Sequence, residues 1–300
     1  MRLVHTTEYD LAVVRGDDVI DITPLFDDIP YRSSIDRVPK LIGAFTEEQD
    51  RVEEFVQNAD PSASLKDVHI LAPVPRPPKL IACQRNYFEG VDRERETQSM
   101  FLESPDSVIG TGGTVVLPPH NATIFHHEAE LALVIGRRSK NLPADERAYD
   151  ALAGYTMAID VSARGLGRMG PSRMGKSFDT FTPLGPWIVT PDEIPNPQNL
   201  DVTLGVGSDI RQSYSTSDME YSVIESLAFI TGYMTLVPGD VIMLGTNHQG
   251  LGPLQDGDQA VMRIQEIGAL EINVVDEKKR KWDPVVDEAM AARTRGEHVS

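Results

Sequence analysis

Two glutamates separated by one residue, Glu128 and Glu130, have the spacing that most directly suggests chemistry. In a β-strand, alternate residues project from the same face, so both carboxylates would point one way. The opposite face would be apolar, lined by Leu131, Leu133 and Ile135. Adjacent like charges repel each other unless a cation lies between them, and hard divalent metals prefer oxygen ligands. The alternative is an exposed acidic face on an edge strand.

A third carboxylate follows thirty residues after Glu130. The apolar run 154–159 ends at Asp160, and Arg164 lies just beyond it. An acid at the end of this strand would complete a Glu-Glu-Asp set, which can hold Mg²⁺ or Mn²⁺. Such a set leaves up to about three octahedral positions for water or substrate. The pattern therefore predicts a metal site formed by Glu128, Glu130 and Asp160.

Further short motifs follow in a fixed order along the chain. They are Gly175-Lys176-Ser177, Pro183-Leu184-Gly185-Pro186-Trp187, Arg211-Gln212, Val237-Pro238-Gly239-Asp240, Gly245-Thr246 and Asp256-Gly257-Asp258. With the three carboxylates, the series resembles the fumarylacetoacetate hydrolase family, from about Pro73 to about Val275. That family includes acylpyruvate hydrolases and 2-hydroxymuconate-type isomerases and decarboxylases. Each motif is weak alone, and the specificity of the signal lies in their order.

The resemblance implies metal-dependent chemistry on a small 2-oxo acid. The acid's carboxylate and carbonyl would chelate the metal, which would stabilise an enolate. Attack by water on a carbonyl two carbons away would then cleave a C–C bond. We predict this hydrolysis of an acylpyruvate-like acid. One alternative is an isomerase, tautomerase or decarboxylase acting on a 2-hydroxymuconate-like or oxaloacetate-like acid. Another is a non-catalytic relative that only binds its ligand.

The resemblance also assigns roles to individual side chains. Lys176 falls where it implies a catalytic lysine near the substrate, although a surface loop lysine is the alternative. Arg164 would bind a substrate carboxylate or hold Asp160 in place, and Thr246 would bind a ligand oxygen or belong only to a turn. The predicted substrate-binding residues are Arg164, Thr180, Thr246, Asn86 and Tyr87.

The chain departs from the family pattern on its predicted flap. Hydrolytic members carry a histidine and then a glutamate after the Asn-Tyr pair, and these activate water. Here Gly90 and Arg93 occupy the two positions. Glu89 and Glu94 lie nearby, and either could serve as a base. Of these we predict Glu94 as the base, or His248 as a proton shuttle, in place of the missing pair. A solvated loop histidine is the alternative for His248.

Three other residues near these motifs bear on the site. Glu103 and Gly167 stand where the family commonly has a lysine and a glutamine, respectively. By strand alternation, His126 shares the face of the carboxylates.

The composition limits the possible partners and compartment. The 300 residues include 46 acidic and 28 basic side chains, a net charge of −18, which argues against nucleic-acid and membrane-surface binding. A single cysteine, Cys83, excludes an internal disulfide and fits a reducing cytoplasm. We interpret Cys83 as a buried apolar residue rather than a nucleophile. No apolar run reaches the ~18–20 residues of a membrane span. The resemblance further implies a homodimer.

These residues require a β-rich framework. We predict an α+β fold, with residues 1–72 as a small α+β module and 73–300 as a mixed β-sandwich roll of the family's C-terminal type. Strands are expected at 10–14 and 18–22, and in the main domain at 79–83, 114–117, 124–136, 154–161, 186–190, 201–206, 241–245, 259–267 and 270–275. Capping boxes predict helices beginning at Thr46 and Ser217. Further helices are expected at 145–153 and 286–295, with a helical flap at 89–98.

Overall fold

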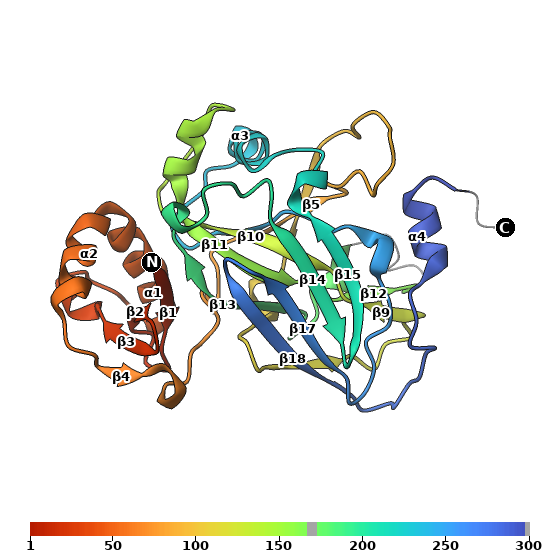
Figure 1. The fold of residues 1–300 in the computed structure, drawn as a ribbon, viewed down its shortest axis with the longest axis horizontal. Helices are drawn as coiled ribbons and strands as arrows, with labels where there is room; N and C mark the ends of the chain where they lie inside the picture. The colour runs from red at the N-terminus through yellow and green to blue at the C-terminus, as the bar shows by residue number, and fades with distance from the viewer. Residues whose placement is uncertain (167–172, 298–300) are drawn as a thin grey trace.

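The computed structural model describes residues 1–166 and 173–297, so Gly167 lies outside the described residues. Two packed β-sheets form the body of the molecule (Figure 1). Within the described residues the larger sheet has 11 strands in the order β4-β3-β2-β1-β13-β11-β10-β16-β5-β6, with β7 paired to β13. Their bounds are β1 Arg2–His5, β2 Leu11–Arg15, β3 Asp18–Asp21, β4 Ala63–Ser64, β5 Leu80–Gln84, β6 Ser99–Glu103, β7 Val108–Ile109, β10 Ala129–Ile135, β11 Leu152–Ile159, β13 Thr182–Val189 and β16 Val241–Met243.

The second sheet covers one face of the first. Its order is β15-β14-β17-β18-β8, and a separate two-stranded sheet pairs β12 with β9. The bounds are β8 Thr114–Leu117, β9 Ile124–His126, β12 Ser162–Arg164, β14 Asp201–Val206, β15 Asp209–Ser215, β17 Gln259–Ile264 and β18 Gly268–Asp276. This β-rich sandwich confirms the predicted fold class, and β15 is a strand that the sequence patterns missed.

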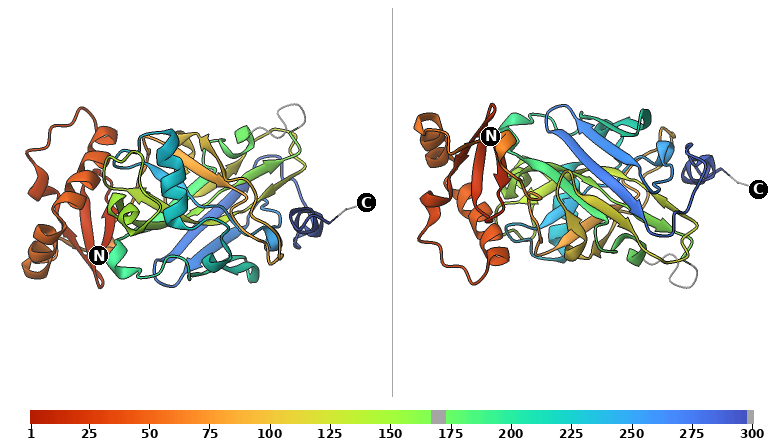
Figure 2. Two further views of the ribbon diagram at one scale, coloured as in Figure 1. Left: turned by 90° about the horizontal axis from the view of Figure 1, so that it is seen from above. Right: turned by 90° about the horizontal axis from the view of Figure 1, so that it is seen from below.

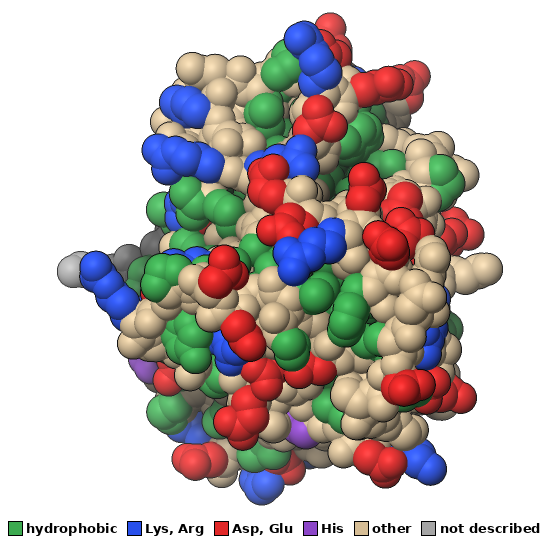
Figure 3. Space-filling view, turned by 90° about the vertical axis from the view of Figure 1, so that its left-hand side faces the viewer, with side chains coloured by type: hydrophobic (Ala, Val, Ile, Leu, Met, Phe, Trp, Pro, Cys, Tyr) green, Lys and Arg blue, Asp and Glu red, His purple; other side chains and the backbone are tan. Residues whose placement is uncertain are grey.

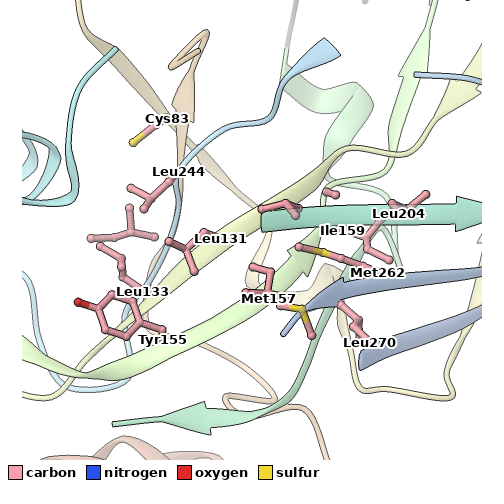
Figure 4. Close-up of a cluster of buried hydrophobic side chains, with 14 of the residues drawn as sticks. Cys83, Leu131, Leu133, Tyr155, Met157, Ile159, Leu204, Leu244, Met262 and Leu270 are labelled. Atoms are coloured by element: carbon pink, nitrogen blue, oxygen red, sulfur yellow. The ribbon is translucent and has the colours of Figure 1, made fainter. Parts of the chain in front are cut away.

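The main core lies between the two sheets. Alternation along β10 sends Leu131, Leu133 and Ile135 into this core. The same core contains side chains of the second sheet such as Leu204 and Met262, which Figure 4 labels together with Leu131 and Leu133. The intervening Ala132 and Val134 belong to a second core on the other face, under helix α1 (Ser34–Glu47). Because both faces are buried, every residue of β10 is buried.

The N-terminal module contains the predicted hairpin, as β2 and β3, and two helices. The helix predicted to begin at Thr46 is wrong in its start: Thr46 lies inside α1, whose N-cap is Ser33. Helix α2 (Gln49–Asn58) then follows a break at Glu48. Strand β1 pairs with β13, so the module continues the main sheet. The division at residue 72 stays a prediction.

Other helix predictions need similar corrections. The helix expected from Ser217 begins after Ser222, which forms a capping box with Glu225 and leads into α3 (Val223–Tyr233). The segment expected as helix 145–153 is a 3₁₀ helix, η4 (Glu146–Ala151), which runs into β11. Residues 89–98 form no helix. The last predicted helix is present as α4 (Glu288–Thr294).

Short 3₁₀ turns make most of the remaining connections. They are η1 Thr23–Phe26, η2 Leu65–Asp67, η3 Pro105–Ser107, η6 Arg173–Lys176, η7 Pro191–Glu193, η8 Thr216–Asp218 and η9 His248–Gly250. The N-terminal module and α4 lie at opposite ends of the molecule in all three ribbon views (Figures 1 and 2). At the end of the molecule formed by the N-terminal module, the surface carries groups of acidic side chains interspersed with basic and apolar ones (Figure 3). None of the described helices has the length and apolar character needed to cross a bilayer.

Candidate active site

The three predicted metal ligands meet where β10 and β11 pair. One oxygen from each of Glu128, Glu130 and Asp160 lies within 4.8 Å of the others, and all three side chains are buried. The antiparallel register places Ala129 opposite Ile159, so the main-chain N–H of Asp160 donates to the carbonyl of Glu128 at 2.8 Å. The single strand predicted over 124–136 is wrong in one respect, because it breaks between β9 and β10 and leaves Glu128 just before β10.

The electrostatics of this cluster fit a divalent cation. Burial and the neighbouring Asp160 raise the pKa of Glu130 well above its usual value. Burial raises the pKa of Asp160 to about 6, despite the opposing effect of Lys176. Asp160 Oδ1 is buried and has no hydrogen-bond partner among the described residues. A hard cation with oxygen ligands would satisfy this atom and offset the repulsion.

Two cations face the cluster from the segment after β11. Lys176 Nζ lies 2.6 Å from Glu128 Oε2 and also bonds Asp160. Burial opposes the charge of Lys176, but Asp160 and Glu128 together outweigh it and raise its pKa. Arg164 pairs with Glu128 rather than with Asp160, the partner that we considered from the sequence. Burial alone would raise the pKa of Glu128, yet Lys176 and Arg164 hold it well below its usual value.

A close backbone approach explains the glycine before Lys176. A Cβ on Gly175 would lie 2.7 Å from the carbonyl oxygen of Ala163 in β12. Only glycine lets η6 pack this tightly on β12, and that packing brings Lys176 to the carboxylates.

The predicted Gly245-Thr246 motif supports the cluster from the loop after β16. Gly245, at a φ of 84°, donates its N–H to Glu130 Oε2 at 2.5 Å. Thr246 lines the cleft, and its hydroxyl accepts a 2.8 Å bond from Gln212. The Gln212 side chain also accepts from the N–H of Ala129 at 3.1 Å. Gln212 therefore ties the start of β10 to the loop that carries Thr246, a role that its motif alone did not reveal.

His248 lies beside the carboxylates and pairs with Glu89, the acid that the sequence offered as an alternative to Glu94. Its Nδ1 is 2.6 Å from Glu89 Oε1, and its main-chain N–H donates to Glu89 Oε2 at 2.7 Å. His248 Nε2 is 4.0 Å from Glu128 Oε1. Neither Glu89 nor Glu94 is among the described cleft-lining residues, but Glu89 is buried at 6% exposure and contacts the cleft-lining His248, whereas Glu94 is exposed. Of the acids on this segment, the structure thus brings Glu89 to the site.

Three predicted substrate-binding residues lie outside the described cleft lining. The Asn86 amide donates to the carbonyls of Tyr221 and Leu244, and the ring of Tyr87 packs edge-on against Tyr214 at 5.1 Å. The Thr180 hydroxyl accepts from the N–H of Val116 at 2.9 Å. In this structure these contacts hold loops in place, and the substrate-binding roles stay predictions.

Two polar side chains neighbour the cluster. His126 lines the cleft, and its Nε2 lies 3.1 Å from Asp287 Oδ2 just before α4. Burial and then Arg164 lower the pKa of His126 to about 4. Glu103 is buried, and burial together with Asp160 raises its pKa well above the usual value.

The cluster opens into a cleft of about 830 Å³. The three clustered carboxylates, Lys176 and Arg164 form its charged inner end, and α4 contributes a wall. A volume of this size suits a small organic ligand. The arrangement can hold a cation, bind an anion beside it and move a proton.

Comparisons with known proteins agree with this geometry. The family described as "Fumarylacetoacetate (FAA) hydrolase C-terminal" matches residues 79–275. Maleylpyruvate hydrolase from Aquipseudomonas alcaligenes is 34% identical over 293 residues, covering 91% of this chain and 99% of the relative. A mitochondrial oxaloacetate tautomerase from Bos taurus is 33% identical, covering 79% of this chain and 81% of the relative.

A solved structure shows the same fold with a bound metal. Maleylpyruvate hydrolase from Sphingobium sp. SYK-6, crystallised with manganese(II) and pyruvate, has a TM-score of 0.81 at 33% identity. The alignment covers 92% of this chain and 99% of that one. A shared fold, a matching domain and relatives of near full length make this chain an enzyme of the fumarylacetoacetate hydrolase family.

Proposed function

We propose that the protein is a divalent-metal-dependent hydrolase that cleaves a C–C bond in a small 2,4-dioxo, acylpyruvate-like acid. The observation that carries the proposal is the Glu89–His248 pair beside the three carboxylates. It offers a proton acceptor at the site although Gly90 replaces the flap histidine of hydrolytic relatives.

The carboxylates Glu128, Glu130 and Asp160 would hold Mg²⁺ or Mn²⁺. When bound, the cation supplies Lewis acidity to the 2-oxo carbonyl and stabilises negative charge on its oxygen. Arg164 and Lys176 hold cationic charge beside this position, where a substrate carboxylate would lie.

His248 would act as the general base. Glu89 accepts from Nδ1–H, which leaves Nε2 free to take a proton from water as its oxygen attacks the 4-carbonyl carbon. The C3–C4 bond then breaks, and its electron pair remains on the three-carbon fragment as the enolate of pyruvate. The proton held at His248 Nε2 returns to C3 of that fragment, so the products are pyruvate and the acid derived from the acyl group.

A tautomerase, isomerase or decarboxylase is the second candidate. It is favoured by the same pair, because proton transfer between carbon and oxygen requires one proton carrier and no water. A non-catalytic relative would keep the carboxylates without turnover. We further propose a cytoplasmic homodimer, for which light scattering of the purified protein gives the molar mass.

The test separates these reactions. Purified protein with Mg²⁺ or Mn²⁺ is mixed with acetylpyruvate, and the enol absorbance is followed while free pyruvate is assayed. Pyruvate release that EDTA abolishes supports hydrolysis. Enol loss above the uncatalysed rate without pyruvate shows tautomerase or isomerase chemistry and contradicts hydrolysis of this acid. The matched inactive control is the same protein carrying Glu130→Gln.

A further inference from the structure

Helix α4 forms a wall of the cleft although it lies beyond the family-matched region, which ends at residue 275. Four of its residues line the cleft: Ala289, Met290, Arg293 and Thr294. Successive members of this set are one, three and one positions apart in the sequence, which places all four on one face of a helix. The composition of this wall is therefore a property of this chain and not of the matched domain.

Hydrogen bonds fix α4 to the turn that carries His248. The Gln249 amide donates to Thr294 Oγ1 at 3.1 Å and to Glu89 Oε2 at 3.1 Å. The main-chain N–H of Asp287 donates to the carbonyl of Leu251 at 2.7 Å. These hydrogen bonds therefore fix the position of α4 relative to the Glu89–His248 pair.

One arginine on this wall differs from the other cations of the cleft. The cleft's cations among the described residues are Arg85, Arg164, Lys176 and Arg293. The first three face carboxylates: Arg85 lies 3.3 Å from Glu96, and the other two contact Glu128. Arg293 has no carboxylate of the described chain within 4.0 Å. In a protein with a net charge of −18, an arginine that lines a cleft without an acidic partner suits an anion.

We propose that Arg293 binds the distal carboxylate of a dicarboxylic 2-oxo acid and so makes the enzyme prefer dicarboxylic over monocarboxylic acylpyruvates. The proposal rests on the proposed function, which places the 2-oxo acid end at the inner carboxylate cluster. The guanidinium can form a bidentate pair with a carboxylate. Met290 beside it offers apolar contact to the intervening carbon chain. The volume of about 830 Å³ leaves space for this longer substrate.

The kinetic test compares Arg293→Ala with wild type on two acids in the presence of Mn²⁺. The acids are maleylpyruvate, which has a distal carboxylate, and acetylpyruvate, which has none. We expect kcat/KM for maleylpyruvate to fall about 10–100-fold and that for acetylpyruvate to change by less than about twofold. Arg138→Ala, at an exposed position away from the cleft, is the matched control and should change neither value.

A binding measurement is independent of turnover. Calorimetry of the Mn²⁺-loaded protein would compare pyruvate with 2-oxoadipate, which carries a second carboxylate. Wild type should bind 2-oxoadipate more tightly, and Arg293→Ala should lose that difference while Arg138→Ala keeps it.

The outcomes separate the two proposals. Equal losses of kcat/KM on both acylpyruvates would mean that Arg293 only supports the fold. Unchanged kcat/KM values would mean that Arg293 contacts no substrate. Either result would overturn the proposed role of Arg293 without contradicting hydrolysis. If the wild-type protein released pyruvate from neither acid, the proposed hydrolase activity would be wrong. The calorimetric comparison would still show whether Arg293 binds a distal carboxylate.

Discussion

His248 Nδ1 lies 2.6 Å from Glu89 Oε1, and both the ring and the main-chain N–H of His248 bond this one carboxylate. Two bonds to one acceptor orient the imidazole and favour the tautomer with its proton on Nδ1. The free Nε2 then faces Glu128, 4.0 Å away. A histidine oriented by an acid beside a metal-type carboxylate cluster is a suitable general base.

Removing either member of this pair is expected to slow hydrolysis. His248→Asn and Glu89→Gln should each lower kcat by about 10²–10⁴, because general-base catalysis contributes that much. Pyruvate release under substrate saturation measures it, with the exposed His69→Asn as control. A His248→Asn protein with wild-type kcat would exclude His248 as the base.

The carboxylate cluster makes a prediction about metal binding. Glu130→Gln should weaken Mn²⁺ binding by more than about 100-fold, since even changes beside metal ligands cost about 10–100-fold. Electron paramagnetic resonance of free Mn²⁺ measures the affinity without requiring activity. Glu53→Gln, on the exposed side of α2, should bind Mn²⁺ as wild type does. Unaltered binding in Glu130→Gln would show that the cation lies elsewhere.

A glycine beside His248 makes a steric prediction. A Cβ on Gly250 would lie 1.9 Å from the carbonyl oxygen of Arg211 in β15, so η9 must move in Gly250→Ala. We expect kcat to fall more than about 10-fold and the free energy of unfolding to fall by about 1–3 kcal/mol. The control is Gly232→Ala in α3, where a Cβ meets no atom within 4 Å and helix propensity favours alanine. Assays paired with urea denaturation would contradict the prediction if both variants matched wild type.

A buried histidine in the N-terminal module makes the protein sensitive to acid. Burial lowers the pKa of His5 from 6.5 to about 4, so between these values the unfolded chain binds a proton that the folded chain does not. Stability is therefore lost as the pH falls through this window. His5→Leu should reduce the loss between pH 7.5 and pH 5 by about 1–2 kcal/mol. Urea denaturation at both values measures it, with exposed His69→Leu as control; an identical loss in wild type and His5→Leu would argue against the buried neutral ring.

The clustering of the three carboxylates was predictable because its geometry is local. Alternation fixes the face of Glu130, and one antiparallel register brings Asp160 opposite Glu128. The Glu89–His248 pair was not predictable, because the two residues are 159 positions apart in the sequence and only tertiary packing brings them together. Glu94 has the same chemistry as Glu89, so composition alone could not choose between them.

The starts of the helices also depend on packing that a local sequence pattern does not contain. Thr46 and Ser217 satisfy the capping pattern, yet the helices begin after Ser33 and Ser222. Each true cap precedes the residues that bury a helix face, for example Val38 and Leu41 in α1. Packing of that face, which a four-residue pattern does not contain, decides where the helix begins.

The pairing of β1 with β13 has a consequence for the family-matched domain on its own. Arg2 and Leu3 lie opposite Val189 and Ile188, and they pair with an edge of β13 that would otherwise be free. Without residues 1–72, those main-chain groups and the apolar surface beneath them would be open to another molecule. Residues 73–300 expressed alone are therefore expected to self-associate edge to edge, and covering this strand edge is a role that we expect of residues 1–72.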